Sequence, residues 1–496
     1  MPRSNHILDL HENVEQIQTR CLKHLLHKGC HTLWGDRHGF KSIDGSYSQF
    51  VKAQPDIISY PDIRDEVMRM VGGEADILWP GVTRHFAQSS GTSDGKSKYI
   101  PITADSFKLT HYRGGSDVVA HYLRLYPESR LFSGKAFILG GSFANELHLN
   151  SGVEVGDLSA NLIQNINPVV NHWRIPDKRT ALMTDWAEKL PALVEASVKE
   201  NITNISGVPS WFLTVLKSVI ERAGVTSVHD LWPNLEVFFH GGISMEPYRQ
   251  QYKKITDPTR MHYLETYNAS EGFFAIQDQK DSRGLLLEID CGIFYEFLPL
   301  DQLDAPHPQA IPAWEVEDGK IYAMIITSCN GLWRYSIGDT VKIESTSPLR
   351  ISIAGRTKHF INAFGEELMV DNADRAIAAV SHALDCEVAN YTAAPVYAGD
   401  HSKGRHEWVI EFTRQPADIE RFADMLDRKL QDLNSDYQAK RTDGIFLDRL
   451  SIVVGRPGVF DRWLASTGKL GGQRKVPRLC NSRQFIEPIL KLNNYD

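Results

Sequence analysis

The chain has 496 residues, 42% hydrophobic and 23% charged, which is ordinary for a globular protein long enough for two or more domains. Its net charge of −8 argues against a general nucleic-acid binder and against binding to an anionic membrane. The N-terminus lacks the apolar core of a signal peptide, and no apolar run approaches the length of a membrane span. Six scattered cysteines predict reduced thiols in a cytoplasmic protein, and the dispersed histidines predict no transition-metal site.

Helices are predicted to dominate the first part of the chain. Apolar residues from Ile7 to Leu25 recur every three or four positions, as on one face of an amphipathic helix. Further helices are predicted over 105–125, 180–199 and 209–223. The last of these begins at Pro209, which suits a first helical turn because its missing N–H has no partner there.

Strands follow, and they indicate a layered α/β body. They are predicted over 235–239, 261–266, 284–290, 293–298, 320–327 and 350–354. Beyond residue 355 the pattern becomes compact: a helix over 371–384, strands over 386–396 and 406–412, a helix after Pro416 and a strand over 450–455. We therefore expect a large α/β domain over 1–355 and a smaller α/β domain over 356–496.

A loop of small polar residues is the most informative segment of the chain. Residues 89–93 read Ser89, Ser90, Gly91, Thr92 and Ser93, and Lys96 and Lys98 follow. Hydroxyls, free backbone N–H groups and glycines can wrap a polyphosphate closely. The spacing is not that of a Walker A loop, since three residues separate Gly91 from Gly95. An ordinary flexible surface loop remains the alternative.

A second polar segment, 265–271, follows a predicted strand. Glu271 would lie where ligands of open α/β sheets bind, and one carboxylate together with phosphates is a usual way to hold Mg²⁺. Tyr267 offers a flat face for a base, and Ser270 belongs to the same segment. The alternative is a tight turn with an exposed, solvated glutamate.

Two more segments complete the pattern. An aromatic strand from Gly331 leads to a Gly-Asp turn, where Asp339 could accept hydrogen bonds from a ribose diol. A simple hairpin turn is the alternative. Glycines flank cations in 355–367 and again in 469–478, which suggests a mobile loop that carries a lysine to an anion, or else a solvated basic loop.

The order of these segments resembles the adenylate-forming superfamily of acyl-CoA synthetases and luciferases. The finer similarity is to its acyl-acid amido synthetase branch, the auxin-responsive family of plants and its bacterial relatives. It rests on Ser89 to Ser93, on Tyr60-Pro-Asp-Ile63 upstream and on Gln473-Arg-Lys-Val-Pro-Arg478 near the end. The resemblance runs from about residue 30 to residue 480, although the Gly-Arg-x-Lys junction at Gly355 is more similar to the wider superfamily.

The resemblance implies a two-domain enzyme that uses ATP and Mg²⁺ to join a small carboxylic acid to an amine, an amino acid being expected. Ser89–Ser93 and Lys98 would bind the phosphates, and Glu271 would bind the metal ion. Asp339 would bind the ribose, and Arg356 would reach the ribose or a phosphate. Lys475 would reach the carboxylate and the α-phosphate, with Lys469 as the rival lysine, and Lys358 would be the hinge. The acyl-pocket candidates are Tyr112, Arg113, Val208 and Trp211, although Trp211 could equally be ordinary core.

Three other functions stay open from the sequence. An acyl-CoA synthetase shares the first step, and Ser466-Thr-Gly-Lys469 partly echoes that class. A nucleotide-binding scaffold that has lost catalysis is the non-enzymatic alternative. A hydrolase could be argued from His240-Gly-Gly. The pattern Gly-x-Ser-x-Gly occurs only at 91–95, inside the loop of small polar residues, where no nucleophile elbow is predicted.

Overall fold

The structure is a computed structural model, and it describes residues 11–494 with short gaps. The gaps are 90–97, 144, 146, 148–151, 243–244, 246–247, 281, 283, 304, 357–359, 362–365, 367, 397–403, 435–436, 439–440, 442–446, 468–475 and 481. The side chains of residues 89, 186, 210, 356 and 360 are also outside the description. The chain forms two compact units, the first made of residues up to 245, 250–337 and 341–352, and the second of 246–249, 338–340 and 353–496.

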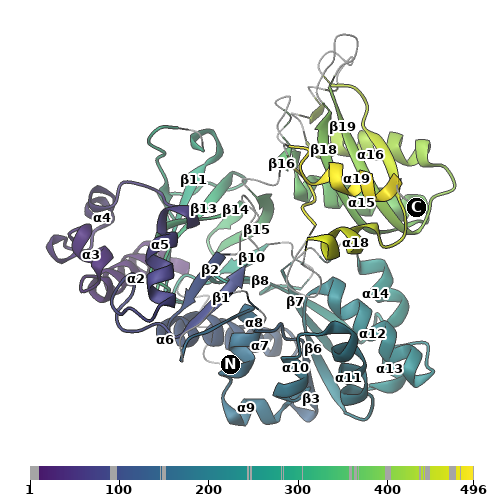
Figure 1. Cartoon of the computed structure of the whole chain (residues 1–496), viewed down its shortest axis with the longest axis horizontal. Helices are drawn as coiled ribbons and strands as arrows, with labels where there is room; N and C mark the ends of the chain where they lie inside the picture. The colour runs from purple at the N-terminus through teal and green to yellow at the C-terminus, as the bar shows by residue number, and fades with distance from the viewer. Residues whose placement is uncertain are drawn as a thin grey trace. The chain divides into compact units, whose positions relative to one another are not determined.

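One large sheet organises the first unit (Figure 1). Within the described residues it has twelve strands, in the order β12 (Ile311–Pro312), β11 (Ile293–Pro299), β13 (Ile321–Ser328), β14 (Leu332–Thr346), β15 (Leu349–Arg356), β10 (Leu285–Leu287), β9 (Gly272–Ile276), β8 (His262–Ala269), β7 (Val237–Gly241), β6 (Ile202–Gly207), β3 (Lys135–Ile138) and β5 (Arg174–Ile175). The strands from β8 to β5 are parallel, whereas β9 and β10 pair antiparallel. The mixed α/β architecture predicted from the sequence is confirmed.

Helices cover both faces of the parallel half. The helices of this unit are α2 (Val14–Gly29), α3 (Leu33–Arg37), α4 (Tyr47–Ala53), α5 (Tyr60–Val71), α6 (Ala104–Ser106), α7 (Tyr112–Leu125), α8 (Leu158–Gln164), α9 (Pro168–His172), α10 (Lys178–Ala181), α11 (Trp186–Val198), α12 (Pro209–Ala223), α13 (Val228–Leu231) and α14 (Arg249–Ile255). Successive side chains of a strand point to opposite faces of the sheet, so neighbouring residues of β7 contact helices on different faces. Phe238 meets Phe212 of α12, with ring centroids 5.4 Å apart, whereas Phe239 meets Tyr122 of α7 at 5.6 Å.

Two predicted helices differ from the structure in their interior. The helix expected over 105–125 contains a π-helical turn over Phe107–His111 between α6 and α7. The helix expected over 180–199 is divided into α10 and α11, because the side chain of Asp185 accepts the N–H of Ala187 and caps a new helix start. The predicted helix 209–223 is confirmed as α12, and the first helix is confirmed as α2 over the residues that are described.

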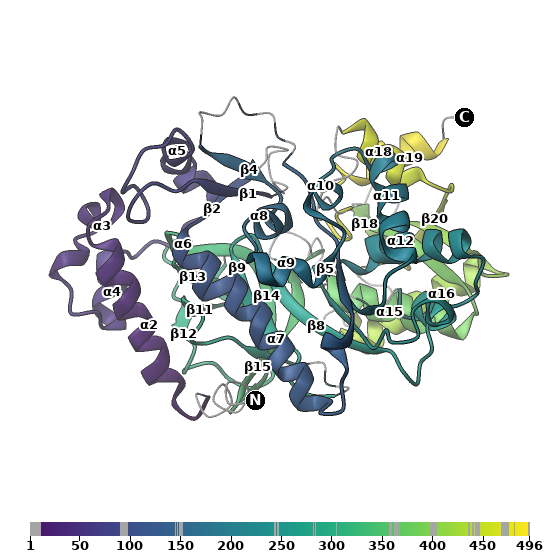
Figure 2. The same ribbon diagram turned by 90° about the horizontal axis from the view of Figure 1, so that it is seen from below.

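The helix α7 packs closely on β9 (Figure 2). A Cβ on Gly114 would lie 2.4 Å from the ring of Phe273, so a larger residue at 114 would push helix and strand apart. At the other end of the sheet, Gln18 of α2 donates to the carbonyls of Ile289 (2.7 Å) and Ile293 (3.0 Å). A small separate sheet has the order β2 (Lys98–Ile102), β1 (His85–Ser89) and β4 (Glu154–Gly156).

The second unit is a smaller α/β sandwich. It contains β16 (Phe360–Ile361), β17 (Leu368–Met369), α15 (Val370–Ala383), β18 (Glu387–Val396), β19 (Arg405–Arg414), α16 (Ile419–Leu433), β20 (Ser451–Gly455), α18 (Val459–Ser466) and α19 (Ile486–Asn494). In β19, Trp408 and Ile410 pack in the core shared with α15 and α16, whereas Val409 packs with α18 and α19. The alternation places two helices on each face of β18–β19–β20. Among the described helices, none combines the length and hydrophobicity needed to span a bilayer.

Candidate functional site

Several predicted site residues follow parallel strands at the same edge of the sheet. β6 ends at Gly207, β7 at Gly241 and β8 at Ala269, and their register places these ends side by side. Val208 comes directly after β6, and Glu271 comes two residues after β8. The carboxyl edge of parallel strands is where open α/β sheets bind ligands, so the fold brings the ends of these strands together at such a position.

Glu271 lies in the tight turn between β8 and β9, but it is not the exposed glutamate of the alternative interpretation. It is 7% exposed, and Ser270 beside it is 6% exposed. The Nδ2 of Asn330 donates to the backbone carbonyl of Glu271 at 2.8 Å and fixes the turn from the β13–β14 connection. A buried carboxylate at such an edge is an unusual and costly arrangement, which supports a ligand-binding role.

Tyr267 is packed rather than open. Its ring lies 4.9 Å from the ring of Phe274, and it belongs to the main hydrophobic core with 5% of its surface exposed. Its predicted contact with a base therefore needs one ring edge or the hydroxyl, and that role stays a prediction.

Asp339 corrects an expectation about local structure. The sequence predicted a turn at Gly338–Asp339, but β14 runs through both residues to Thr346. Gly338 has a φ of 83°, a conformation that glycine adopts without strain, so the strand can bend there without ending. Asp339 is 6% exposed, and its predicted role toward a ribose stays a prediction.

Polar groups gather near the Glu271 turn. The hydroxyl of Tyr335 and the Oδ1 of Asn330 are buried, and no described residue forms a hydrogen bond with either atom. Burial, and then the carboxylate of Glu271, raise the pKa of the Tyr335 hydroxyl well above its usual value. This phenol is therefore protonated at neutral pH and can donate a hydrogen bond. Sequence analysis named neither Asn330 nor Tyr335 as a site residue, although Tyr335 belongs to the aromatic strand that leads to Gly338 and Asp339.

The predicted phosphate loop is borne by the β1–β2 hairpin. Ser89 and Lys98 face each other across the two strands. Tyr60, in the motif at the start of α5, accepts the backbone N–H of Tyr99 at 3.0 Å and so fixes the outer edge of β2. Ser90, Gly91, Thr92 and Ser93 and the side chain of Ser89 lie outside the described residues, and their phosphate-binding role stays a prediction.

The four acyl-pocket candidates lie on α7 and α12. Tyr112 donates to the carbonyl of Leu162 at 3.0 Å, and burial raises its pKa to about 12. Arg113 forms an ion pair with the carboxylate of Asp290 and also donates to its carbonyl at 3.0 Å. Val208 precedes α12 and Trp211 lies in its first turn, both half-buried. The guanidinium of Arg113 is thus already neutralised, and the acyl-pocket role of the four residues stays a prediction.

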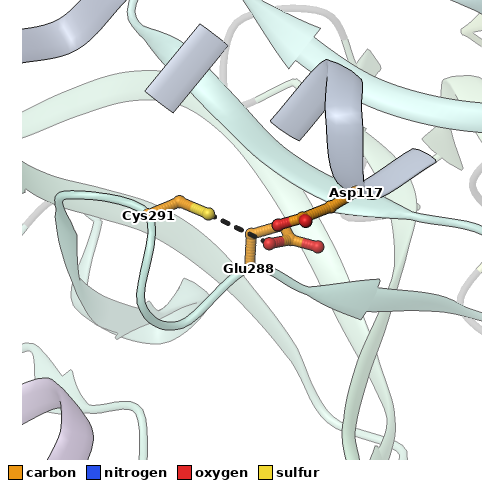
Figure 3. Close-up of side chains that lie close together, drawn as sticks. All are labelled: Asp117, Glu288 and Cys291. Atoms are coloured by element: carbon orange, nitrogen blue, oxygen red, sulfur yellow. Dashed lines mark hydrogen bonds between the residues drawn. The ribbon is translucent and has the colours of Figure 1, made fainter. Parts of the chain in front are cut away.

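A buried polar group close to Arg113 was not foreseen from the sequence (Figure 3). Ligand-type atoms of Asp117, Glu288 and Cys291 all lie within 4.8 Å of one another, and Cys291 donates its S–H to Glu288 at 3.0 Å. Burial and the Glu288 carboxylate raise the pKa of the Cys291 thiol well above its usual value. Because metals bind the thiolate, a protonated donor thiol indicates a hydrogen-bonded part of the core.

The remaining predicted residues belong to the junction and the C-terminal loop. Arg356 is the last residue of β15, and its side chain is outside the description. Lys358, Lys469 and Lys475 also lie outside the described residues, so their roles as hinge and mobile lysines stay predictions.

Models of three domains of one family match the chain. They are the GH3 family N-terminal domain over residues 3–261, the central domain over 286–356 and the C-terminal domain over 371–484. The chain is 22% identical to an indole-3-acetic acid-amido synthetase, GH3.15 of Arabidopsis thaliana, over 98% of this chain and 93% of that protein. It is 26% identical to a jasmonoyl–L-amino acid synthetase, GH3.5 of Oryza sativa subsp. japonica, over 53% of this chain and 49% of that protein.

Solved structures show the same fold. The GH3.15 acyl acid amido synthetase superimposes with a TM-score of 0.78 at 19% identity, covering 99% of this chain and 96% of that one. A 2-hydroxyisobutyryl-CoA ligase in the postadenylation state gives a TM-score of 0.62 at 13% identity, covering 98% and 93%. The adenylate-forming fold predicted from the motifs is confirmed. Because the N-terminal model alone matches more than half of the sequence, the chain belongs to the GH3 family.

Proposed function

We propose that the chain is an ATP-dependent acyl-acid amido synthetase. It activates a small carboxylic acid as an acyl-adenylate and then transfers the acyl group to an amine, with an amino acid as the expected acceptor. The observation that carries the proposal is the buried Glu271 in the turn after β8, at the carboxyl edge of the sheet of a GH3-family chain. The amido synthetases among its relatives support the reaction type.

The chemistry has two balanced steps. In the first, a carboxylate oxygen attacks the α-phosphorus of ATP, the bond to the bridging oxygen of the β-phosphate breaks, and pyrophosphate leaves. In the second, the amine nitrogen attacks the acyl carbon, AMP leaves with the bonding electrons, and the amine loses a proton. Two anions must meet in the first step, so positioning and cations supply much of the catalysis.

The residues expected to bind the nucleotide come from several segments of the chain. Ser89 to Ser93 and Lys98 would bind phosphates, and Ser270 and Tyr267 would line the same site. Asp339 would accept hydrogen bonds from the ribose diol, with Arg356 near ribose or phosphate. Val208, Trp211, Tyr112 and Arg113 remain the candidates for the acyl pocket.

The residues around Glu271 fit a magnesium ion. A carboxylate is the hard oxygen ligand that Mg²⁺ prefers, and Mg²⁺ keeps several waters that need hydrogen-bond partners. The buried Asn330 Oδ1, which has no hydrogen-bond partner among the described residues, is such a group. When bound, Mg²⁺ would neutralise charge on the phosphates. Glu271 would hold it, and the turn fixed by Asn330 would orient that carboxylate.

The second unit would supply a lysine for the first step only. We assign Lys475 to the attacking carboxylate and the α-phosphate, and Lys358 to the hinge about which this unit turns before the amine attacks. Six cysteines without a disulfide support a reducing, cytoplasmic setting.

ATP–pyrophosphate exchange over a panel of carboxylic acids tests the first step. We expect exchange with one class of carboxylic acid. The proposal would be refuted if no acid supported exchange and the protein did not bind MgATP. Mass analysis of products with amino acids or with CoA then tests the second step. A thioester without amide would show that the acyl-CoA synthetase alternative is correct.

A further inference from the structure

The hydroxyl of Tyr335 is a buried polar group that the protein itself does not satisfy. Tyr335 is 0% exposed, and among the described residues its oxygen has no hydrogen-bond partner. Buried tyrosine hydroxyls nearly always find a partner, because leaving one without a partner destabilises the folded state. The exception therefore needs an explanation.

The backbone holds Tyr335 in place on both sides. Ile58 donates its N–H to the carbonyl of Arg334 at 3.0 Å and accepts the N–H of Ser336 at 2.7 Å. This isolated parallel bridge pairs Ile58 with Tyr335. These bonds fix the backbone at Tyr335, and the side chain is fully buried, so the hydroxyl lies inside the protein.

The surroundings of the hydroxyl belong to the proposed nucleotide site. The carboxylate of Glu271 acts electrostatically on the Tyr335 hydroxyl, as does the hydroxyl of Tyr60. Asn330, five residues earlier in the chain, donates to the backbone carbonyl of Glu271. Its own Oδ1 is buried and has no hydrogen-bond partner in the part of the chain that the structure describes. Among the described residues, the Tyr335 hydroxyl, which can donate, and the Asn330 Oδ1, which can accept, thus lack partners near the carboxylate of Glu271.

We propose that Tyr335 is a ligand-binding residue whose hydroxyl donates a hydrogen bond to a phosphate oxygen of magnesium-bound ATP. The inference rests on the proposed function, because it needs Glu271 to hold the metal–nucleotide complex. Asn330 would complete the arrangement, since its Oδ1 can accept a hydrogen bond from a metal-bound water. The protein would thus leave two buried atoms unsatisfied until the nucleotide binds.

Tyr335→Phe tests this inference, because it removes one oxygen and keeps the packed ring. The thermal midpoint of the ligand-free protein should stay unchanged or rise, since no hydrogen bond is lost and a buried polar atom is removed. The dissociation constant of MgATP, measured by calorimetry, should rise about 10- to 100-fold, as expected for one hydrogen bond to a charged group. The kcat/KM for pyrophosphate exchange should fall by a similar factor.

Tyr122→Phe is the matched control. The hydroxyl of Tyr122 is also buried in the first unit, but it donates to the carboxylate of Glu236 at 3.1 Å. Its loss should lower the thermal midpoint and leave MgATP affinity unchanged. The opposite signs of the two variants separate a ligand contact from a structural contact.

Unchanged MgATP affinity in Tyr335→Phe, with normal exchange, would overturn the inference and leave the proposed function intact. A lowered thermal midpoint in the ligand-free variant would also overturn it, because it would reveal a protein partner for the hydroxyl. Wild-type protein that neither binds MgATP nor supports exchange would overturn the proposed function instead.

Discussion

The buried ion pair between Arg334 and Glu296 gives the sharpest stability prediction. Both side chains are almost fully inaccessible, at 2% and 0% exposed. The Nε of Arg334 donates to both oxygens of Glu296, at 3.0 and 3.2 Å, and one Nη donates at 2.8 Å. The same guanidinium donates to the carbonyl of Gln54 at 3.0 Å. After Arg334→Met, the Tyr47 hydroxyl would be the one remaining donor to the buried Glu296 among the residues that the structure describes.

Breaking one side of such a pair costs about 3–5 kcal/mol, because the remaining charge is buried without compensation. That is a large share of the roughly 5–15 kcal/mol by which domains are stable. Replacing both residues, in Arg334→Met with Glu296→Met, removes both buried charges and should recover most of the loss. The double variant is therefore expected to be much more stable than the single one.

Urea denaturation of both variants, with the midpoint and slope fitted separately, measures these differences. A single variant that loses less than about 1 kcal/mol would refute the reasoning, since it would mean that water or another donor solvates Glu296. A double variant as unstable as the single one would also refute it, because packing and not charge would then set the cost.

Other predictions concern the proposed reaction and pH. Glu271→Gln should abolish pyrophosphate exchange, and wild-type exchange at saturating Mg²⁺ would exclude its metal role. Asp339→Ala should weaken ATP binding by about 3 kcal/mol, roughly a hundredfold; unchanged ATP affinity with weakened acid binding would move it to the acyl pocket. Lys475→Ala should fail in pyrophosphate exchange yet still convert a supplied acyl-adenylate to amide. If only Lys469→Ala showed this behaviour, Lys469 and not Lys475 would be the lysine of the first step. Burial lowers the pKa of His11 and His111 to about 4. The stability that their neutral forms contribute is therefore complete above the usual pKa of 6.5 and should be lost as the pH falls toward 4. Acid denaturation measures this loss.

Elements with local signals were predictable. The helix over 209–223 is α12 because its proline and apolar spacing act within one element. The turn at Gly338 was predicted wrongly, because a glycine with positive φ can bend a strand as well as end it. Whether β14 continues is decided by the strands on either side, and these lie elsewhere in the sequence.

The site was predictable by residue type but not by environment. The segment that holds Glu271 is visible in the sequence, whereas its burial depends on Asn330, which lies 59 residues away. Likewise Arg113 is neutralised by Asp290, 177 residues later. Such pairings have no periodic signal, since they follow from how distant strands and helices pack.

Two buried polar groups of the first unit differ in a way that separates structure from binding. In the group around Cys291, the thiol donates to Glu288, so the folded chain supplies at least one partner itself. Tyr335 and Asn330 each have a buried oxygen that no described residue hydrogen-bonds, and both lie near the Glu271 turn. Other buried atoms of the described residues, such as Trp408 Nε1, also lack a hydrogen-bond partner, so a missing partner alone does not indicate a ligand site. The Tyr335 hydroxyl differs because it lies near the buried carboxylate of Glu271, where stability can be given up for binding. Tyr335→Phe should therefore leave the free protein at least as stable as the wild type while it lowers MgATP affinity.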